Sequence, residues 1–215
     1  MWFQMLRLLC TFALVVSWCA AQEKHPVYKF STTVTGEPLY TFGTTVAANS
    51  GLKGDIYLLK AGAPKLPNFA KLKPVGSIYT PYLCVPARSF DEGFPGVTDR
   101  FEWFAIDYAG RFWVSEPGLY RFVLESDDGS ILYIDGKKVI DNDKTHAVIE
   151  KGGDISLKSG VHQIRVSYFQ GPRFHVALVL RVAGPKDDEL HVFDTNDFKP
   201  PADAPDWDVP KSRKR

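Results

Sequence analysis

Apolar side chains recur at every second position in three segments of the chain. These segments are residues 119–125 (LYRFVLE), 162–169 (HQIRVSYF) and 174–182 (FHVALVLRV). Successive side chains of a strand point to opposite faces, so an apolar period of two predicts three half-buried β-strands. Residues 51–60 (GLKGDIYLLK) are expected to open a further strand.

Turn residues separate these strands. Asp135-Gly136 stands between two short apolar runs in residues 131–140, and this dipeptide predicts a β-hairpin because glycine tolerates the positive φ of a tight turn. The proline-rich residues 64–95 are expected to form long loops over the sheet surface. The aromatic residues 101–114 are expected to form core around a turn at Ala109-Gly110.

The pattern predicts an all-β fold. Residues 101–182 carry no long helical period, and short strands separated by turn residues are typical of an antiparallel β-sandwich or barrel. The chain has 215 residues, of which 45% are hydrophobic and 24% charged, an ordinary composition for a globular protein with a buried core.

The first 21 residues have the pattern of a secretory signal peptide. A weakly basic start is followed by an apolar run at 8–18 and by Cys19-Ala20-Ala21, which suits cleavage before Gln22. The apolar run is shorter than the roughly 20 residues that span a bilayer, so no membrane span is expected after cleavage. Lipid attachment at Cys19 is disfavoured because the bulky Trp18 stands where such signals have a small residue.

The expected organisation has four parts. They are a signal peptide at 1–21, an N-terminal extension at 22–50, a β-sandwich domain at 51–183 and a polar, proline-rich C-terminal extension at 184–215. The predicted location is secreted, periplasmic or on the cell surface.

Charge and cysteine content exclude several classes of function. Removal of Arg7 with the signal leaves 25 basic and 25 acidic residues, with basic residues crowded at the extreme C-terminus and no basic stripe for nucleic acid. Only Cys84 would remain, so no internal disulfide is possible, and the histidines lack the spacing of a zinc site. No nucleophile elbow, zinc-protease motif or phosphate-binding loop occurs, and we expect no enzyme.

Asp127 and Asp128 stand side by side between two predicted strands. Adjacent strand residues point to opposite faces, so the pair calls for a special explanation. In one interpretation the carboxylates accept backbone N–H hydrogen bonds in a turn that also uses Gly129. In the other they bind a ligand together. Asp141-Asn142-Asp143 forms a second acidic cluster, which lacks the pattern of an EF-type calcium loop and is expected to be a solvated turn.

Three segments carry a resemblance to a known family: residues 51–57 (GLKGDIY), 118–140 (GLYRFVLESDDGSILYIDGKKVI) and 160–171 (GVHQIRVSYFQG), followed by a closing apolar strand. Over residues 51–182 the chain resembles the protective-antigen-type PA-14 domain. The resemblance implies a jelly-roll-like β-sandwich and a non-catalytic module, found in bacterial toxins, glycosidases and fungal adhesins, that often recognises carbohydrate.

The resemblance also implies a site. In the adhesin branch the paired aspartates are joined by a cis peptide and bind Ca²⁺, which in turn binds sugar hydroxyls. This places the metal on Asp127 and Asp128, with Gln170 where the adhesins have an asparagine. The expected ligand-binding residues are Phe169, Phe174 and His146, although Phe169 also suits a buried strand position.

Two functions of different classes follow. The first is a secreted binding module for a glycan or cell-surface polysaccharide that uses calcium. The alternative is a structural or protein-interaction module of the exported cell surface, in which the aspartates only shape a turn and the partners are other exported proteins.

Overall fold

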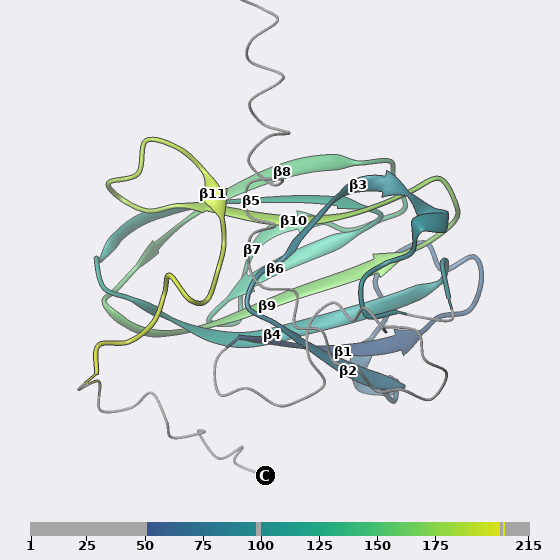
Figure 1. Cartoon of the computed structure of the whole chain (residues 1–215), viewed down its shortest axis with the longest axis horizontal. Helices are drawn as coiled ribbons and strands as arrows, with labels where there is room; N and C mark the ends of the chain where they lie inside the picture. The colour runs from purple at the N-terminus through teal and green to yellow at the C-terminus, as the bar shows by residue number, and fades with distance from the viewer. Residues whose placement is uncertain (1–50, 98–99, 203, 205–215) are drawn as a thin grey trace, which may run out of the picture. The chain divides into compact units, whose positions relative to one another are not determined.

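The computed structural model describes residues 51–97, 100–202 and 204. The predicted signal peptide at 1–21 and extension at 22–50 lie outside the described residues, and the predicted boundary at residue 183 stays a prediction. The described chain folds into two antiparallel sheets packed face to face, a β-sandwich without a closed barrel, which confirms the predicted fold class (Figure 1). In this part of the chain no helix is long and apolar enough to cross a bilayer.

One sheet has six strands in the order β2-β1-β4-β9-β6-β7. Their bounds are β1 Leu52–Leu58, β2 Gly76–Thr80, β4 Phe104–Val114, β6 Ser130–Ile134, β7 Lys137–Asn142 and β9 Gly160–Gln170. The longest strands, β4 and β9, lie at the centre and pair along their whole length, from Phe104 with Gln170 to Val114 with Gly160.

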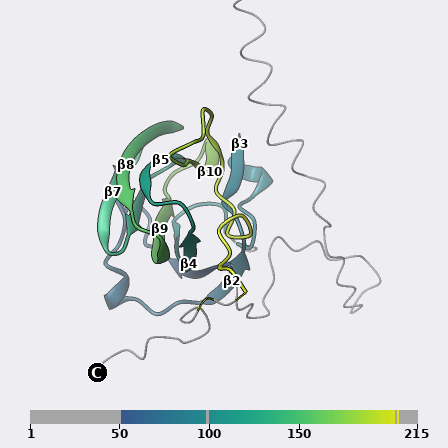
Figure 2. The same ribbon diagram turned by 90° about the vertical axis from the view of Figure 1, so that its left-hand side faces the viewer.

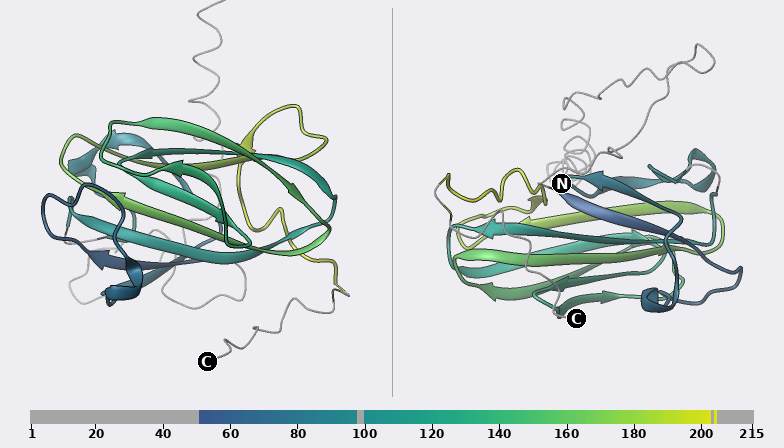
Figure 3. Two further views of the ribbon diagram at one scale, coloured as in Figure 1. Left: turned by 180° about the vertical axis from the view of Figure 1, so that it is seen from behind. Right: turned by 90° about the horizontal axis from the view of Figure 1, so that it is seen from below.

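The second sheet has the order β11-β10-β5-β8, with β3 also paired to β10. Its strands are β3 Cys84–Ser89, β5 Gly118–Asp127, β8 Ile149–Leu157, β10 His175–Ala183 and β11 His191–Val192. Two single-turn 3-10 helices, η2 Phe69–Lys71 and η3 Phe90–Glu92, complete the described elements. Figure 2 shows the two sheets as separate layers, and Figure 3 shows the same ribbon from behind, with the layers one above the other, and from below, where the sheets overlap.

The core lies between the inner faces of the two sheets. Phe104, Phe112, Phe122, Leu124 and Leu132 are fully buried there. The alternation of apolar and polar residues dictates this arrangement, because one face of each strand must leave water. Burial of large aromatic side chains provides much of the apolar area that stabilises the sandwich.

The predicted hairpin is confirmed. Asp135 and Gly136 have φ values of 51° and 78° and connect β6 to β7, so both turn residues adopt the left-handed conformation that a primed turn requires.

The predicted turn at Ala109-Gly110 is wrong, because β4 runs through both residues without a break. A Cβ at Gly110 would lie 2.7 Å from Leu52 Cδ2 and 2.8 Å from the Gly51 carbonyl oxygen. Glycine therefore serves a close approach to the start of β1 rather than a change of direction.

The proline-rich residues 64–95 contain more regular structure than expected, since β2 and β3 lie within them. Near the C-terminal end of the described residues, β11 pairs with β10 and Phe193 is fully buried. The backbone N–H of Trp113 donates to the carbonyl of Phe198. Residues 191–198 therefore pack on the sandwich.

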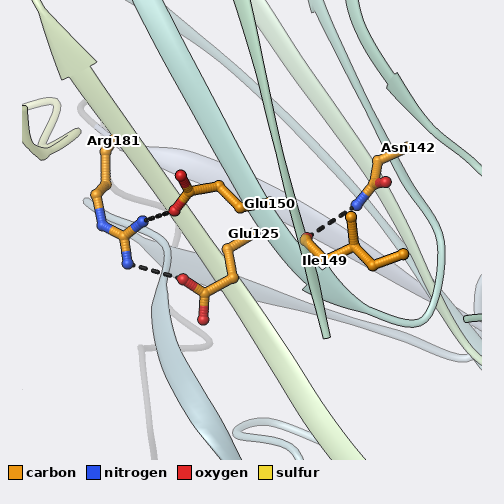
Figure 4. A network of polar contacts seen from close by, with 5 residues as sticks. All are labelled: Glu125, Asn142, Ile149, Glu150 and Arg181. Carbon is orange, nitrogen blue, oxygen red and sulfur yellow. Dashed lines mark hydrogen bonds and ion pairs between the residues drawn. The ribbon is translucent and has the colours of Figure 1, made fainter. Parts of the chain in front are cut away.

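A polar network ties the outer face of the five-stranded sheet together. The Arg181 guanidinium on β10 bonds Glu125 Oε2 on β5 at 2.8 Å and Glu150 Oε2 on β8 at 2.7 Å (Figure 4). One arginine thus bridges three neighbouring strands, with a planar group suited to two carboxylates.

Candidate functional site

Asp127 and Asp128 lie at one end of the sandwich, where β5 passes into β6. Asp127 ends β5, and its side chain and that of Asp128 are only 5% and 2% exposed. The peptide bond between them is cis. A Cβ at the following Gly129 would lie 2.4 Å from Phe169 Cε1 and 2.8 Å from Lys144 N, so the turn passes too close to its neighbours for any other residue.

Two loops donate hydrogen bonds to Asp128. The His146 N–H, from the loop between β7 and β8, donates to Oδ1 at 3.1 Å, and the Gly171 N–H, from the loop between β9 and β10, donates to Oδ2 at 2.7 Å. Asp128 thereby links three loops of the sandwich, those between β5 and β6, β7 and β8, and β9 and β10. Each of its carboxylate oxygens keeps a second lone pair.

Burial makes both carboxylates costly to ionise. Loss of water, and then the neighbouring Asp128 carboxylate, raise the pKa of Asp127 to about 6 from 3.8. Burial also raises the pKa of Asp128, against the backbone N–H groups of Gly171 and His146 that lower it. Within the described residues neither carboxylate forms an ion pair, so their negative charge is offset only by backbone N–H groups and by the neighbouring histidines.

A buried polar chain lies beside the pair. Ser126 and Ser130, which flank the two aspartates, place their Oγ atoms 2.7 Å apart, and Asn142 Nδ2 donates to Ser126 Oγ at 3.1 Å. Asn142 also donates to the Ile149 carbonyl at 3.2 Å, as Figure 4 shows, while its Oδ1 is buried without a hydrogen-bond partner.

The prediction of a solvated turn at residues 141–143 is therefore wrong for Asn142, which ends β7 and is fully buried. Asp141, by contrast, is exposed and pairs with Lys138. The sequence signal for a buried Asn142 is weak, since short polar residues that follow a hairpin are usually solvated.

Gln170 is fully buried and its side chain is held from both ends. The Tyr168 hydroxyl lies 2.6 Å from Gln170 Oε1 and 2.7 Å from the Asp127 carbonyl oxygen, and Gln170 Nε2 donates to the His175 carbonyl at 3.0 Å. The amide oxygen thus lies near the backbone of Asp127. That Gln170 also binds calcium stays a prediction.

Phe169 is fully buried, and the expectation that it stacks on a ligand is wrong. It points to the outer face of the six-stranded sheet, where it packs in a second apolar cluster with Tyr57, Leu59 and Ala105. Residues of the loop after β1, including Phe69, and Trp103 cover this cluster. A side chain without solvent access offers no surface to a sugar ring.

Phe174 and His146 lie on the two loops that donate hydrogen bonds to Asp128, and they differ in exposure. Phe174 is 78% exposed in the loop between β9 and β10, with φ 131°, and its carbonyl accepts from the Phe90 N–H at 3.2 Å. The His146 ring is folded back, with Nδ1 2.7 Å from the Ala147 carbonyl oxygen and Nε2 2.8 Å from that of Asn142. Of the predicted ligand-binding side chains, Phe174 offers the most free surface.

The donor chemistry of the pair fits a hard divalent cation. Buried charges in proteins are usually paired or coordinate a metal, and Ca²⁺ takes six to eight oxygen ligands. Among the described residues no group of three or more His, Cys, Asp or Glu side chains lies together. That Asp127 and Asp128 hold such an ion stays a prediction; the remaining ligands would then come from carbonyl, water or ligand oxygens.

Comparison with known proteins identifies the domain. Residues 87–191 match the model of the PA14 domain family, a range that includes all six candidate residues. β1 and β2 lie outside the matched range but continue the same sheet. No curated protein is significantly similar in sequence.

Solved structures share the fold at low sequence identity. An anti-sigma factor domain-containing protein superposes with a TM-score of 0.55 at 20% identity; the match covers 72% of this chain and only 49% of that protein. The PA14 sugar-binding domain of an RTX adhesin gives 0.56 at 16% identity, covering 69% and 97% of the two chains. The epithelial adhesin 9 A domain from Candida glabrata gives 0.50 at 15% identity, covering 69% and 88%.

The family match extends from β3 to β11 and the architecture is that of solved PA14 domains, so this chain contains a PA14 domain.

Proposed function

We propose that this protein is an exported, non-catalytic carbohydrate-binding module that binds its glycan through a calcium ion on Asp127 and Asp128. One observation supports the proposal most directly: two adjacent carboxylates are buried at the end of the sandwich where β5 passes into β6, without an ion-pair partner among the described residues. A cation would offset their mutual repulsion and their loss of water.

The solved relatives support the class of ligand. The adhesin domain with a TM-score of 0.56 is described as sugar-binding, and the epithelial adhesin domain was solved with Galβ1-3GlcNAc. The shared fold alone does not determine function, so the proposal depends on the site itself.

The chain's own residues would prepare the site in two ways. The N–H groups of Gly171 and His146 fix Asp128 in one orientation. Phe174 presents an exposed ring on the adjoining loop, and such a ring can pack against the apolar face of a sugar. When bound, calcium would supply direct coordination of sugar hydroxyls.

The proposed role is binding rather than catalysis. In a glycosidase one carboxyl group acts as the general acid and a second acts as the nucleophile or general base, and the two groups lie about 5–9.5 Å apart. Asp127 and Asp128 are neighbours in the chain and share one site, so they suit a joint ligand. Export is proposed from the pattern at residues 1–21.

One observation favours the alternative, a structural or protein-interaction module. Both oxygens of Asp128 accept backbone N–H groups from other loops, as expected of a residue that shapes a turn. This alternative predicts partner binding that is insensitive to chelation.

A glycan-array measurement with and without a chelator distinguishes the two. The proposal predicts saturable glycan binding that chelation abolishes and added calcium restores, and that Asp127→Asn and Asp128→Asn each reduce at least tenfold, because one ligand charge is lost. Asp188→Asn, an exposed carboxylate outside the site, is the matched control and should bind normally. Glycan binding that survives chelation and both substitutions would contradict the proposal.

A further inference from the structure

The Tyr168 hydroxyl contacts the backbone of the aspartate pair from inside the sandwich. Tyr168 is fully buried on β9, opposite Ser130 of β6, and its ring stacks on Phe94 with the centroids 4.9 Å apart. Its Oη lies 2.7 Å from the Asp127 carbonyl oxygen, which belongs to the peptide that joins Asp127 to Asp128. The packed ring therefore places one polar atom against the main chain that carries the two carboxylates.

The hydroxyl has one hydrogen and two acceptors. Burial raises the pKa of Tyr168 well above its ordinary value, so the hydroxyl stays protonated and donates at neutral pH. The Asp127 carbonyl oxygen lies at 2.7 Å and Gln170 Oε1 at 2.6 Å, and neither oxygen can donate in return. The two acceptors therefore share one hydrogen, and Gln170 helps to decide where the hydroxyl points.

Both ends of the Gln170 amide are already in use. Nε2 donates to the His175 carbonyl at 3.0 Å, while Oε1 faces the Tyr168 hydroxyl. An exchange of the two ends would bring Oε1 against the His175 carbonyl oxygen, which is also an acceptor, so the contacts fix the orientation. The side chain is fully buried, and turning it towards an ion would leave a buried polar atom without a partner.

Other donors hold the two carboxylates themselves. The Val148 N–H donates to the Asp127 carboxylate, and the N–H groups of His146 and Gly171 donate to that of Asp128. These donors fix the side chains, whereas the Tyr168 hydroxyl fixes the peptide between them. Outer contacts of this kind orient the residues that bind a metal.

We propose that Tyr168 and Gln170 are positioning residues of the aspartate site. The Tyr168 hydroxyl holds the peptide between Asp127 and Asp128 so that both carboxylates reach one ion, and Gln170 orients this hydroxyl instead of binding the ion. The inference rests on the calcium-dependent function proposed above. It departs from the expectation that Gln170 is a metal ligand.

Terbium luminescence tests the role of Gln170. Tb³⁺ is a hard cation that can replace Ca²⁺ on oxygen ligands, and its decay rates in H₂O and D₂O count the water molecules on the bound ion. Gln170→Met keeps the length of the side chain and removes both polar atoms. The proposal predicts an unchanged number of bound waters, whereas loss of a ligand would admit a further water to the ion. An additional water in Gln170→Met would overturn the proposal.

Tyr168→Phe tests the hydroxyl. Calcium affinity, measured by calorimetry on the folded protein, should fall about tenfold, as is typical when the outer support of a metal ligand is removed. Tyr120→Phe is the matched control, because its buried hydroxyl donates to the Glu116 carbonyl at 2.8 Å near the start of β5, and it should bind calcium normally. Equal affinity of Tyr168→Phe and the parent protein, or equal losses in both variants, would overturn the proposal.

A double variant shows whether the two residues act together. If Gln170 acts through Tyr168, Gln170→Met should also weaken calcium binding, and the double variant should bind no more weakly than Tyr168→Phe alone. Additive losses would overturn the shared role. A parent protein that binds neither Ca²⁺ nor Tb³⁺ is a different outcome, since it would remove the calcium site itself and this inference with it.

Discussion

The two aspartates differ in how the protein supports their charge. Asp128 accepts hydrogen bonds from two backbone N–H groups, whereas Asp127 accepts one, from Val148, and burial together with the neighbouring Asp128 carboxylate raises its pKa to about 6. Hydrogen bonds to a carboxylate favour its charged form, and a neighbouring like charge opposes it. Asp127 therefore ionises less readily than a solvated aspartate, and a bound cation would favour its charged form.

The metal-free protein should lose stability relative to Asp127→Asn as pH rises. The folded-state pKa of Asp127 lies above its ordinary value of 3.8, so the folded protein binds this proton more tightly than the unfolded chain does. The free energy of unfolding then falls as pH increases from about 4 to about 6. Urea denaturation of both proteins in metal-free buffer at pH 4.5 and 7 measures this. A stability difference between them that is independent of pH would contradict the assigned pKa.

Gly129→Ala should destabilise the fold at the site. The added Cβ would lie 2.4 Å from Phe169 Cε1 and 2.8 Å from Lys144 N and O, and overpacking of this kind costs about 1–3 kcal/mol. Chemical denaturation measures the free energy of unfolding. Gly76→Ala is the control, because a Cβ there meets nothing within 4 Å. Equal stability of the two variants would show that the turn has room to adjust.

At the scale of single elements, local pattern predicts some strands and not others. β5 and β9 largely alternate apolar and polar residues, whereas β10 is apolar at nearly every position, and the turn at Asp135-Gly136 is encoded by two adjacent residues. β8 is not predicted, because only Ile155 and Leu157 in it are buried apolar residues and two glycines interrupt it. A Cβ at Gly153 would lie 2.4 Å from the Val139 carbonyl oxygen, so this glycine is needed for a contact with β7 that the local sequence does not reveal.

Gly110→Ala tests whether a glycine in β4 is likewise needed for a close contact with the neighbouring strand. In a turn, alanine could be tolerated, but in the observed strand its Cβ would meet the Gly51 carbonyl oxygen at 2.8 Å and Leu52 Cδ2 at 2.7 Å. We expect a loss of about 1–3 kcal/mol in the free energy of unfolding, since the backbone of β1 must shift. A variant as stable as the parent protein would mean that β1 and β4 are not so closely packed.

At the scale of the whole molecule, the fold was predictable and the site only in part. Period-two patterns specify a sandwich, and the resemblance carried by residues 126–130 located the aspartate pair. The burial of Asn142 was not predictable, because the ends of β7 and β8 enclose it, and that of Phe169 was predicted only as one of two alternatives, because the loop after β1 that covers it could not be placed from the sequence. Such cover comes from residues far apart in the chain.

The two ends of the sandwich have different chemistry. At one end three loops meet around the paired carboxylates, and at the other a pocket at the end of β8 is lined by two aspartates and two lysines. Rigid strands between them keep each constellation in place, while the loops at the ends are free to carry specificity.

Calorimetric titration of calcium into the metal-free protein tests the role of the aspartate pair most directly. We expect saturable binding at one site, a rise in thermal stability with calcium, and loss of both in Asp128→Asn, with Asp188→Asn unchanged. No heat of binding and no change in thermal stability across millimolar calcium would contradict the metal site and leave the aspartates as residues that shape a turn.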